Sequence, residues 1–409
     1  MENKINEETN IIAENELYYI ITNIPNTTLE DIYNYSAIID KQGRMITDFM
    51  PLGTIIKDNS KWREISIPYH HQFPNYNKLN VADAIIGTAI GDAYGVPFEF
   101  VSRIRVKDLN IKEMLGYDVT PVIKSRWGTF IPSGSWSDDT SMTIATIESI
   151  NQNNGNINYD DIMKNFLKWA NEGEFSSQNY SFGIGTTTKQ ALEKFTKGTK
   201  ALECGGAEEK DNGNGSLMRM LPFVLYAIKS KLSEESTYKL ICEATSLTHA
   251  HEVSKMGCFI YAEYLKNIIE TKNPVISLDR IQDIDYTIYF SEETIDKYDE
   301  LLQDNFIFID EKHISQSGYI IETLKSVIYS LIHGKNFEET LNIAINLGYD
   351  TDTVGAITGG IAGLLYTQKE IPEKWLSKLR KKEYLLNISS RYENTLNNLQ
   401  PEHNKNKYQ

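Results

Sequence analysis

The sequence predicts an all-α protein, in which a compact multi-helix domain follows a small mixed α/β N-terminal extension. From Val81 onward apolar residues recur with helical spacing and strand signals are scarce. Before that point, short Tyr- and Ile-rich runs alternate with prolines. The chain has 409 residues, 41% hydrophobic and 24% charged, which suits a globular fold with a full core. We expect an extension over 1–77, a helical domain over 78–387 and a polar, frayed tail over 388–409.

The extension contains two strand signals and a linker. Leu17–Ile24 is rich in Tyr and Ile, and Ala37–Asp40 and Met45–Phe49 flank the turn-like segment Lys41–Arg44, which predicts a hairpin. Pro68–Asn80 has two prolines and no apolar period, as is typical of a linker. The domain boundary is therefore expected within this segment.

Several helices are predicted in the domain that follows. Val81–Tyr94 is apolar and contains Gly87 and Gly91, which indicates a helix closely packed in the core. Three further stretches carry apolar residues on one helical face. These are Leu217, Leu221, Val224, Leu225 and Ile228; Ile320, Leu324, Ile328 and Leu331; and Val354, Ile357, Ile361, Leu364 and Leu365. The acidic segment Ser291–Asp310 is expected to be an excursion between helices.

Charge and composition disfavour several classes of function. The 41 Lys+Arg and 56 Asp+Glu leave a formal net charge of −15, which argues against nucleic acid or an anionic membrane surface as a partner. No apolar run reaches the ~18 residues of a spanning helix, and the longest is Met220–Ile228. The polar N-terminus shows no secretory signal, and the three cysteines form no CxxC pair. We expect a cytoplasmic protein without a disulfide framework.

Two acidic clusters carry the clearest chemical signal. GSWSDDT (Gly134–Thr140) and LGYDTDT (Leu347–Thr353) each precede an apolar helical stretch. Either cluster alone has an ordinary explanation, because Ser, Asp and Thr cap helix N-termini and carboxylates suit the positive end of the helix dipole.

Together the two clusters predict a metal centre. If they meet in the core, they bring four carboxylates together, and Glu99 in VPFEF would add a fifth. Burying several unpaired anions costs several kcal/mol each, and neither motif contains Lys or Arg. Carboxylate and hydroxyl oxygens are hard ligands that suit Mg²⁺ or Mn²⁺ rather than zinc. The sequence therefore predicts two divalent cations, Mg²⁺ or Mn²⁺, which would neutralise these charges and activate a water for hydrolysis.

Five motifs follow one another over about 280 residues: IIGTAIGDAYGVPFEF (Ile85–Phe100), SWSDDTSM (Ser135–Met142), NGNGSLMRMLPF (Asn212–Phe223), LTHAHE (Leu247–Glu252) and LGYDTDTVGAITGGIAG (Leu347–Gly363). In this order they resemble the ADP-ribosylglycohydrolase family, which includes the dinitrogenase reductase-activating glycohydrolases. The resemblance implies an all-α fold around a binuclear Mg²⁺ or Mn²⁺ centre that hydrolyses the glycosidic bond of ADP-ribose.

The resemblance also implies roles for particular residues. The implied metal ligands are Ser137, Asp138, Asp139, Asp350, Asp352 and Thr353. The family usually has Thr at the first of these positions, and Ser137 retains the hydroxyl. The implied catalytic carboxylates are Glu99, Asp139 and Asp352, and the sequence does not decide which of them is the base. Asp92 lies in the family's Gly-Asp pair and equally suits a buried hydrogen-bonding role between helices.

A second group of residues is expected to bind ADP-ribose. In NGNGSLMR, glycines would let backbone N–H groups approach the pyrophosphate, and a helix beginning near Ser216 would offer its positive end, although a plain helix cap explains the pattern equally well. His249 matches a family motif near the ligand, whereas His251 has no such support. Gly183 stands where some members carry an Asp, so an acid that would recognise arginine is missing at this point. The expected binding residues are Gly183, Gly213, Asn214, Gly215, Ser216 and His249.

The expected function is metal-dependent removal of ADP-ribose from a modified protein side chain, with arginine favoured. A metal phosphohydrolase is disfavoured, because none of the seven histidines forms a His-Asp dipeptide. Some bacterial relatives are immunity proteins that also block an ADP-ribosyltransferase toxin through an N-terminal segment. Residues 1–77 are therefore a candidate docking segment for such a toxin, and packing on the helical core explains them equally well. The alternative function is a non-catalytic protein that blocks the transferase.

Overall fold

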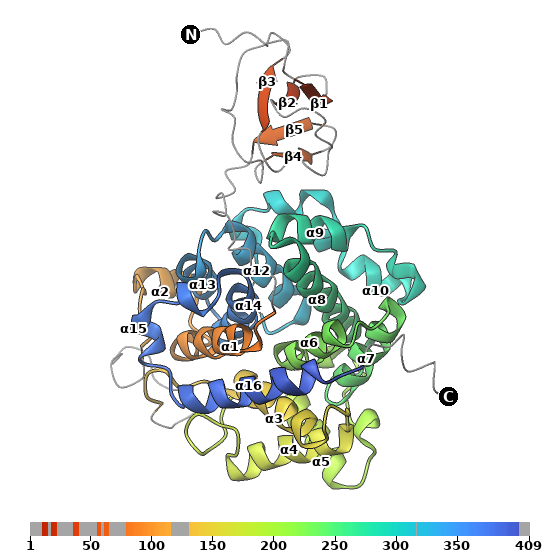
Figure 1. Ribbon diagram of the computed structural model, residues 1–409, viewed down its shortest axis with the longest axis vertical. Coiled ribbons are helices and arrows are strands. Elements are labelled where there is room, and N and C mark those ends of the chain that lie inside the picture. The colour runs from red at the N-terminus through yellow and green to blue at the C-terminus, as the bar shows by residue number, and fades with distance from the viewer. Residues whose placement is uncertain are drawn as a thin grey trace. The chain divides into compact units, whose positions relative to one another are not determined.

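The computed structural model describes residues 79–115, 131–315 and 317–400, together with five short strands within 10–64 (Figure 1). The chain divides into two compact units. One comprises Met1–Gln72 with Gln303–Ile309, and the other comprises Phe73–Leu302 with Asp310–Gln409.

The first unit contains a sheet and a separate hairpin. Strands β1 (Asn10–Glu14), β2 (Tyr18–Thr22) and β3 (Ser36–Asp40) form an antiparallel sheet in the order β1-β2-β3. Strands β4 (Ile55–Asp58) and β5 (Lys61–Glu64) pair with each other. The partner of β3 is β2, with Tyr19 opposite Ile39, whereas the expected partner segment Met45–Phe49 lies outside the described residues.

The second unit is helical, which confirms the predicted fold class. Its α-helices are α1 (Val81–Gly95), α2 (Arg103–Asp108), α3 (Asp138–Gln152), α4 (Tyr159–Glu172), α5 (Thr186–Thr196), α6 (Leu221–Lys229), α7 (Glu234–Ser246), α8 (Glu252–Thr271), α9 (Pro274–Gln282), α10 (Glu292–Lys297), α11 (Asp299–Leu302), α12 (Ile320–His333), α13 (Phe337–Asn346), α14 (Thr351–Tyr366), α15 (Glu373–Leu376) and α16 (Lys382–Asn397). The 3₁₀ turns are η2 (Val96–Phe98), η3 (Ala201–Glu203), η4 (Glu209–Asp211), η5 (Leu217–Arg219), η6 (Tyr286–Ile288), η8 (Glu311–His313) and η9 (Gln368–Glu370), and η7 (Asp304–Phe308) belongs to the first unit. None of the helices described here is long and apolar enough to cross a lipid bilayer.

Helices α1 and α14 form the centre of the helical unit, and their backbones touch. A Cβ atom at Gly87 would overlap the carbonyl of Gly359, and one at Gly91 would overlap the carbonyl of Gly355. Along this contact the residue numbers rise in α1 and fall in α14, so the two helices are antiparallel. Further along, Gly95 lies against the carbonyl of Thr351, which places the first turn of α14 beside the end of α1.

The predicted apolar faces of α12 and α14 are buried, as expected from their spacing. The stretch from Leu217 to Ile228 forms two elements rather than one helix. Leu217–Arg219 is a 3₁₀ turn, and α6 begins only at Leu221, with Pro222 in its first turn. Proline lacks an N–H group and fits the first turn of a helix, which explains the break.

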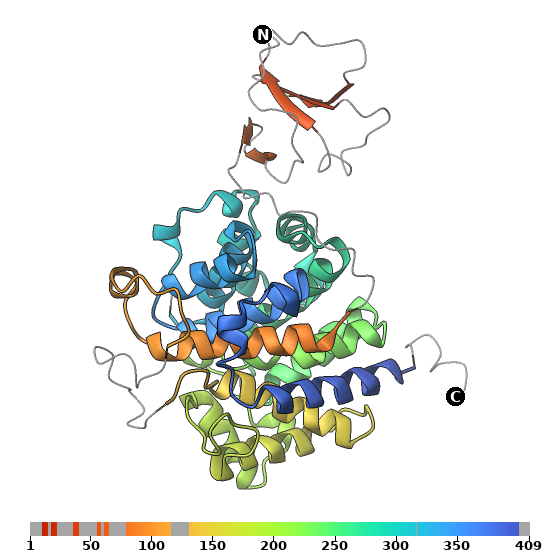
Figure 2. The ribbon, with the colours of Figure 1, turned by 60° about the vertical axis from the view of Figure 1, so that its left-hand side comes forward.

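The C-terminal end requires a correction. The expectation of a frayed tail from residue 388 is wrong up to residue 397, because α16 continues to Asn397 and buries Ile388, Tyr392 and Leu396. These residues lie four apart and form an apolar stripe that the polar composition hides. Helix α16 (blue) runs along α1 and α3 in both views (Figures 1 and 2). Residues 401–409 lie outside the described part.

The contact between α1 and α14 leaves no room for a side chain. Gly91→Ala should lower the free energy of unfolding by about 3 kcal/mol, because the new methyl group meets backbone rather than a flexible side chain. Gly185→Ala is the matched control, since a Cβ there has no neighbour within 4 Å, and it should cost no more than about 1 kcal/mol, because Gly185 is the N-cap of α5 and Ala caps less well than Gly. Urea unfolding measures both, and equal stability of the two variants would contradict the packing.

Candidate functional site

A cavity of about 240 Å³ brings together most of the residues singled out in the sequence. The predicted residues that line it are Glu99, Asp138, Gly183, Gly213, Asn214, Gly215, His249, Asp350, Asp352 and Thr353. Ser137, Asp139 and Ser216 do not line it. The two acidic clusters therefore meet, as the sequence predicts, at the first turns of α3 and α14.

Asp92 on α1 holds the first turn of α3 in place. Its carboxylate accepts hydrogen bonds from the backbone N–H of Ser137 (2.9 Å) and of Thr140 (3.1 Å), and from the Thr140 hydroxyl (2.6 Å). These bonds assign Asp92 the hydrogen-bonding role between helices. Burial raises its pKa to about 6, although the hydrogen bonds act in the opposite direction.

Ser137 is the N-cap of α3 and is bonded to Asp139. Its hydroxyl donates to Asp139 Oδ2 (2.9 Å) and accepts from the Asp139 N–H (3.4 Å). Asp139 is fully buried, and its Oδ1 has no hydrogen-bond partner in the described part of the chain. Burial, with the nearby charges of Asp92 and Asp138, raises the pKa of Asp139 well above its usual value, and burial raises that of Asp138 to about 7.

The first turn of α14 supplies the facing carboxylates. Carboxylate oxygens of Glu99, Asp350 and Asp352 lie within 4.8 Å of one another. Asn214 Nδ2 donates to Asp350 Oδ2 (2.5 Å), and the Thr353 N–H donates to Asp352 Oδ1 (3.0 Å). Burial, followed by the charges of Glu99 and Asp139, raises the pKa of Asp352 well above its usual value. The carboxylates of the two acidic clusters thus lie close enough for each to disfavour ionisation of the other.

The donor set fits hard divalent cations. Asp138, Asp139, Asp350 and Asp352 form no ion pair with Lys or Arg within the residues that the structure describes. One oxygen of Asp139 lacks any partner there, and every side chain in the set offers oxygen. Such an arrangement of buried anions is stabilised by cations of high charge density. Glu99, expected from the sequence as a catalytic residue, also stands close enough to Asp350 and Asp352 to share a cation with them.

A backbone clamp that the sequence did not reveal joins the two halves of the site. The Phe100 N–H donates to the Tyr349 carbonyl (2.5 Å), and the Tyr349 N–H donates to the Val101 carbonyl (2.7 Å). Phe100 and Tyr349 adopt left-handed backbone conformations with φ of 62° and 57°. Phe100 directly follows Glu99, and Tyr349 directly precedes Asp350. The clamp therefore positions both carboxylates. Neither residue type signals such a conformation, because aromatic residues rarely adopt it.

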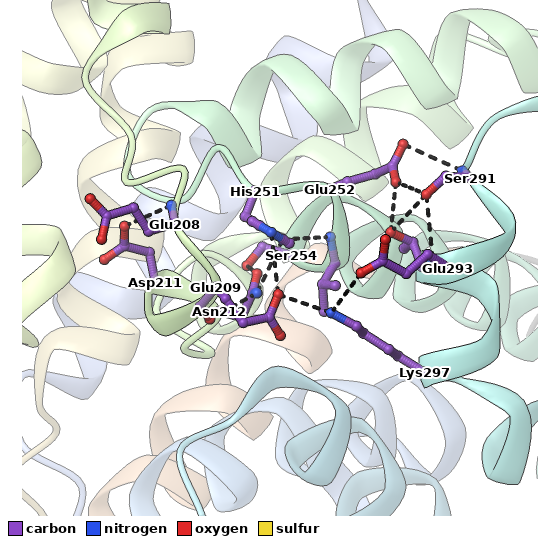
Figure 3. A network of polar contacts seen from close by, with 12 residues as sticks. Glu208, Glu209, Asp211, Asn212, His251, Glu252, Ser254, Ser291, Glu293 and Lys297 are labelled. Carbon is purple, nitrogen blue, oxygen red and sulfur yellow. Dashed lines mark hydrogen bonds and ion pairs between the residues drawn. The ribbon is translucent and has the colours of Figure 1, made fainter.

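The glycine-rich loop is held by its neighbours. The Asn214 N–H donates to the Gly318 carbonyl (2.9 Å), and the Ile320 N–H donates to the Asn212 carbonyl (3.1 Å). The Asn212 side chain donates to the Glu209 carbonyl (3.0 Å) and accepts from the Ser254 hydroxyl (2.9 Å), in the network of Figure 3. The loop is therefore preformed.

His251 belongs to the same supporting network and not to the cavity. Its Nδ1 lies 3.1 Å from Asn212 Nδ2 and accepts from the Val253 N–H at 3.2 Å (Figure 3). Its Nε2 lies 3.4 Å from a Glu209 oxygen that also binds Lys297. His251 thus anchors the loop from behind.

The loop differs from the predicted helix N-terminus. Only the 3₁₀ turn Leu217–Arg219 follows it, so no long helix offers a positive end. Ser216 is fully buried, with its hydroxyl 3.4 Å from Cys258 Sγ, and it does not face the cavity. Gly213 and Gly215 remain on the cavity wall. A Cβ at Gly213 would have no neighbour nearer than 3.6 Å, whereas one at Gly215 would lie 2.9 Å from His249 Cε1.

Gly183 and His249 complete the cavity wall. Gly183 has φ of +93°, and a Cβ there would overlap the Asp138 carboxylate, so its backbone lies directly against that group. His249 is buried, and its Nδ1 lies 2.8 Å from the Thr248 hydroxyl. Burial, assisted by the charge of Arg219, lowers the pKa of His249 to about 3, so the ring is neutral.

Comparisons with known proteins find related sequences and a related structure. Residues 76–403 match the family model described as ADP-ribosylglycohydrolase. The chain is 30% identical over 310 residues to the ADP-ribosylarginine hydrolase Tri1 of Serratia proteamaculans, covering 75% of this chain and 76% of that protein. It is 24% identical to the ADP-ribosyl-[dinitrogen reductase] glycohydrolase of Rhodospirillum rubrum, covering 72% and 88%. A solved ADP-ribosylglycohydrolase-related protein complex matches with a TM-score of 0.61 and 25% identity, covering 77% of this chain and 97% of that one.

The raised pKa of Asp138 predicts a pH-dependent stability of the metal-free protein. The folded state holds this proton more tightly than the unfolded state, so the contribution is complete below about pH 4 and is lost as the pH rises through about 7. Asp138→Asn should therefore match the parent at pH 4 and exceed its free energy of unfolding by about 2–4 kcal/mol at pH 8.

Asp160→Asn, on the exposed surface of α4, is the control and should not reproduce the gain in stability of Asp138→Asn at pH 8. Urea unfolding in the presence of a chelator measures all three proteins. A difference between Asp138→Asn and the parent that stays constant from pH 4 to 8 would show that folding does not raise the pKa of Asp138.

Proposed function

The chain belongs to the ADP-ribosylglycohydrolase family, and we propose that it uses two divalent cations to remove ADP-ribose from modified arginine side chains. Its enzymatic class follows from the family: it is a hydrolase of the glycosidic bond of ADP-ribose. The observation that carries the metal proposal is the meeting of Asp138 and Asp139 of α3 with Asp350 and Asp352 of α14, beside Glu99.

Six residues would hold the cations, Mg²⁺ or Mn²⁺: Ser137, Asp138, Asp139, Asp350, Asp352 and Thr353. The Ser137 hydroxyl, now bonded to Asp139 Oδ2, lies at the correct end of α3 to contribute its oxygen. When bound, such cations supply positive charge that polarises substrate oxygens and lowers the pKa of water.

Proton transfer is assigned to a carboxylate at the cavity. Glu99 is the leading candidate, because it lines the cavity and is only partly buried, so its proton can exchange with solvent. Asp352 also lines the cavity, whereas Asp139 is fully buried and does not line it. In an oxocarbenium-like transition state the anomeric carbon carries positive charge, which the carboxylates at the cavity would stabilise.

The charge distribution gives ADP-ribose one favourable orientation. The anionic pyrophosphate would be repelled by the aspartates and suits the part of the wall formed by Gly213 and His249, where the Arg219 cation lies buried behind His249. The distal ribose would then lie towards the carboxylates. Gly183, pressed against Asp138, would border this ribose, and Asn214 would position Asp350.

The choice of arginine rests on a relative. The Serratia proteamaculans protein is named for ADP-ribosylarginine, and 30% identity over three quarters of both chains favours the same substrate class. We place this reaction in the cytoplasm, with an ADP-ribosylated protein as the substrate and no role for nucleic acid or membrane.

The N-terminal extension is proposed to dock an ADP-ribosyltransferase toxin, so that the protein acts in immunity. In the described sheet, β1 and β3 are the edge strands. Edge strands offer backbone groups to which a partner can add a strand. The chain retains all six candidate metal ligands. This favours a protein that both docks the toxin and catalyses hydrolysis over a non-catalytic protein that only blocks the transferase.

Removal of a cluster carboxylate should abolish hydrolysis. With an arginine-ADP-ribosylated protein and Mg²⁺, Asp352→Asn should lower turnover by about a thousandfold, equivalent to about 4 kcal/mol in the barrier. A chelator should have the same effect on the parent. Asp83→Asn is the matched control, because Asp83 is a buried aspartate on α1 that does not line the cavity.

Turnover of Asp352→Asn within about threefold of the parent would contradict the metal assignment, since that is less than ~1 kcal/mol. The same assay with a serine-linked substrate tests the choice of arginine, which fails if the serine-linked bond is cleaved faster.

The docking proposal predicts two separable effects of the extension. Deletion of residues 1–77 should leave hydrolysis nearly intact, because every candidate ligand lies downstream. The full-length Asp352→Asn variant should still inhibit an ADP-ribosyltransferase that is encoded by a neighbouring gene. The same variant without residues 1–77 should not inhibit it. Equal inhibition by both forms, or none by either, would refute docking through the extension.

A further inference from the structure

Arg219 is a buried cation without a buried anion beside it. Its side chain is fully inaccessible to solvent and forms no ion pair with any carboxylate in the part of the chain that the structure describes. Its Nη2 donates to the Ala244 carbonyl (3.1 Å) and to the Thr248 hydroxyl (2.7 Å), and the guanidinium lies 5.3 Å from the centre of the Phe166 ring. Nε and Nη1 have no partner among the described residues. So costly a placement calls for an explanation beyond packing.

The hydroxyl group of Thr248 joins Arg219 to His249, and the direction of its hydrogen bonds explains the placement of Arg219. Arginine only donates hydrogen bonds, so the contact with Nη2 uses a lone pair of the Thr248 oxygen. The same oxygen lies 2.8 Å from His249 Nδ1. If Nδ1 carried the proton, the Thr248 hydroxyl hydrogen would be left without an acceptor at a fully buried position. If the hydroxyl donates to Nδ1 instead, the Thr248 hydroxyl has both a donor, Arg219 Nη2, and an acceptor, His249 Nδ1.

The opposite edge of the His249 ring faces the cavity. The nearest ring atoms to a Cβ built on Gly215 are Cε1 at 2.9 Å and Nε2 at 3.4 Å, and Nε2 is also the nearest atom to one built on Gly213, at 3.6 Å. Both glycines and His249 line the cavity. With Nδ1 as an acceptor, Nε2 bears the hydrogen and presents a neutral donor beside the exposed loop backbone.

We propose that Arg219 is a positioning residue: through the Thr248 hydroxyl it holds His249 in the tautomer whose Nε2–H points into the cavity. There Nε2–H donates to an anionic oxygen of the ADP-ribose pyrophosphate, a step that rests on the proposed function. The low pKa of His249 agrees with this arrangement, because burial and the Arg219 charge keep the ring neutral. Arg219 thus assists anion binding without touching the ligand.

A purely structural role for Arg219 would have different consequences, since packing on Phe166 would be indifferent to the proton on His249. Nitrogen-15 NMR of the imidazole distinguishes protonated from unprotonated ring nitrogens in the ligand-free protein. We expect His249 to show an unprotonated Nδ1 and a protonated Nε2 in the parent and in Thr248→Ser. Thr248→Val, of nearly the same shape but without the hydroxyl, should lose this single tautomer. A proton on Nδ1 in the parent overturns the proposal.

Calorimetry with ADP-ribose measures the consequence for binding. Thr248→Val should weaken affinity about tenfold, and Thr248→Ser should remain within about twofold of the parent. Thr245→Val is the matched control, because the Thr245 hydroxyl donates to the Ile241 carbonyl of its own helix at 2.7 Å and forms no hydrogen bond with the His249 ring among the described residues. An altered tautomer with unchanged affinity overturns the donor role.

Arg219→Met tests the role of Arg219 directly and should change the His249 tautomer and the ADP-ribose affinity as Thr248→Val does. If Arg219→Met does not fold, the Thr248 variants test the proposal. Failure of the parent to bind ADP-ribose would count against the proposed function. The tautomer in the ligand-free protein would still decide whether Arg219 positions His249.

Discussion

The backbone contact between α1 and α14 is the constraint on which the rest of the structure depends. Gly87 and Gly91 let the two helices touch along their length, and the antiparallel packing brings the end of α1 to the start of α14. Glu99 thereby reaches the aspartates of α14, and Asp92 reaches the first turn of α3. A core made of backbone contacts thus fixes three segments that are distant in sequence around one cavity.

Buried groups of opposite charge lie at the cavity and behind its wall. The buried aspartates raise one another's pKa and leave one oxygen of Asp139 without a partner in the described residues. Arg219 is a buried cation that is joined to His249 through the Thr248 hydroxyl. Each set is unfavourable alone, and cations bound by the aspartates together with an anion bound near His249 would relieve both. The strain of the protein without ligand is therefore informative about what it binds.

The sequence predicts the parts of this account that depend on local pattern. Apolar spacing identifies α12 and α14, and the two acidic motifs identify the four aspartates at the first turns of α3 and α14. Features that depend on distance between segments are not predictable in this way: the partners of Asp92 on α3, the burial of Ser216 and the left-handed clamp at Phe100 and Tyr349. The polar composition after residue 387 likewise hides the apolar stripe of α16, because Ile388, Tyr392 and Leu396 are separated by polar residues in the sequence.

The central claim is that the carboxylates of α3 and α14 form one cation-binding centre. Anomalous diffraction at the manganese edge, from crystals of the full chain grown with Mn²⁺, tests it most directly. The account predicts two strong peaks in the cavity, in contact with oxygens of Asp138 or Asp139 and of Asp350 or Asp352. A cavity without anomalous density, while manganese binds elsewhere on the protein, would contradict it.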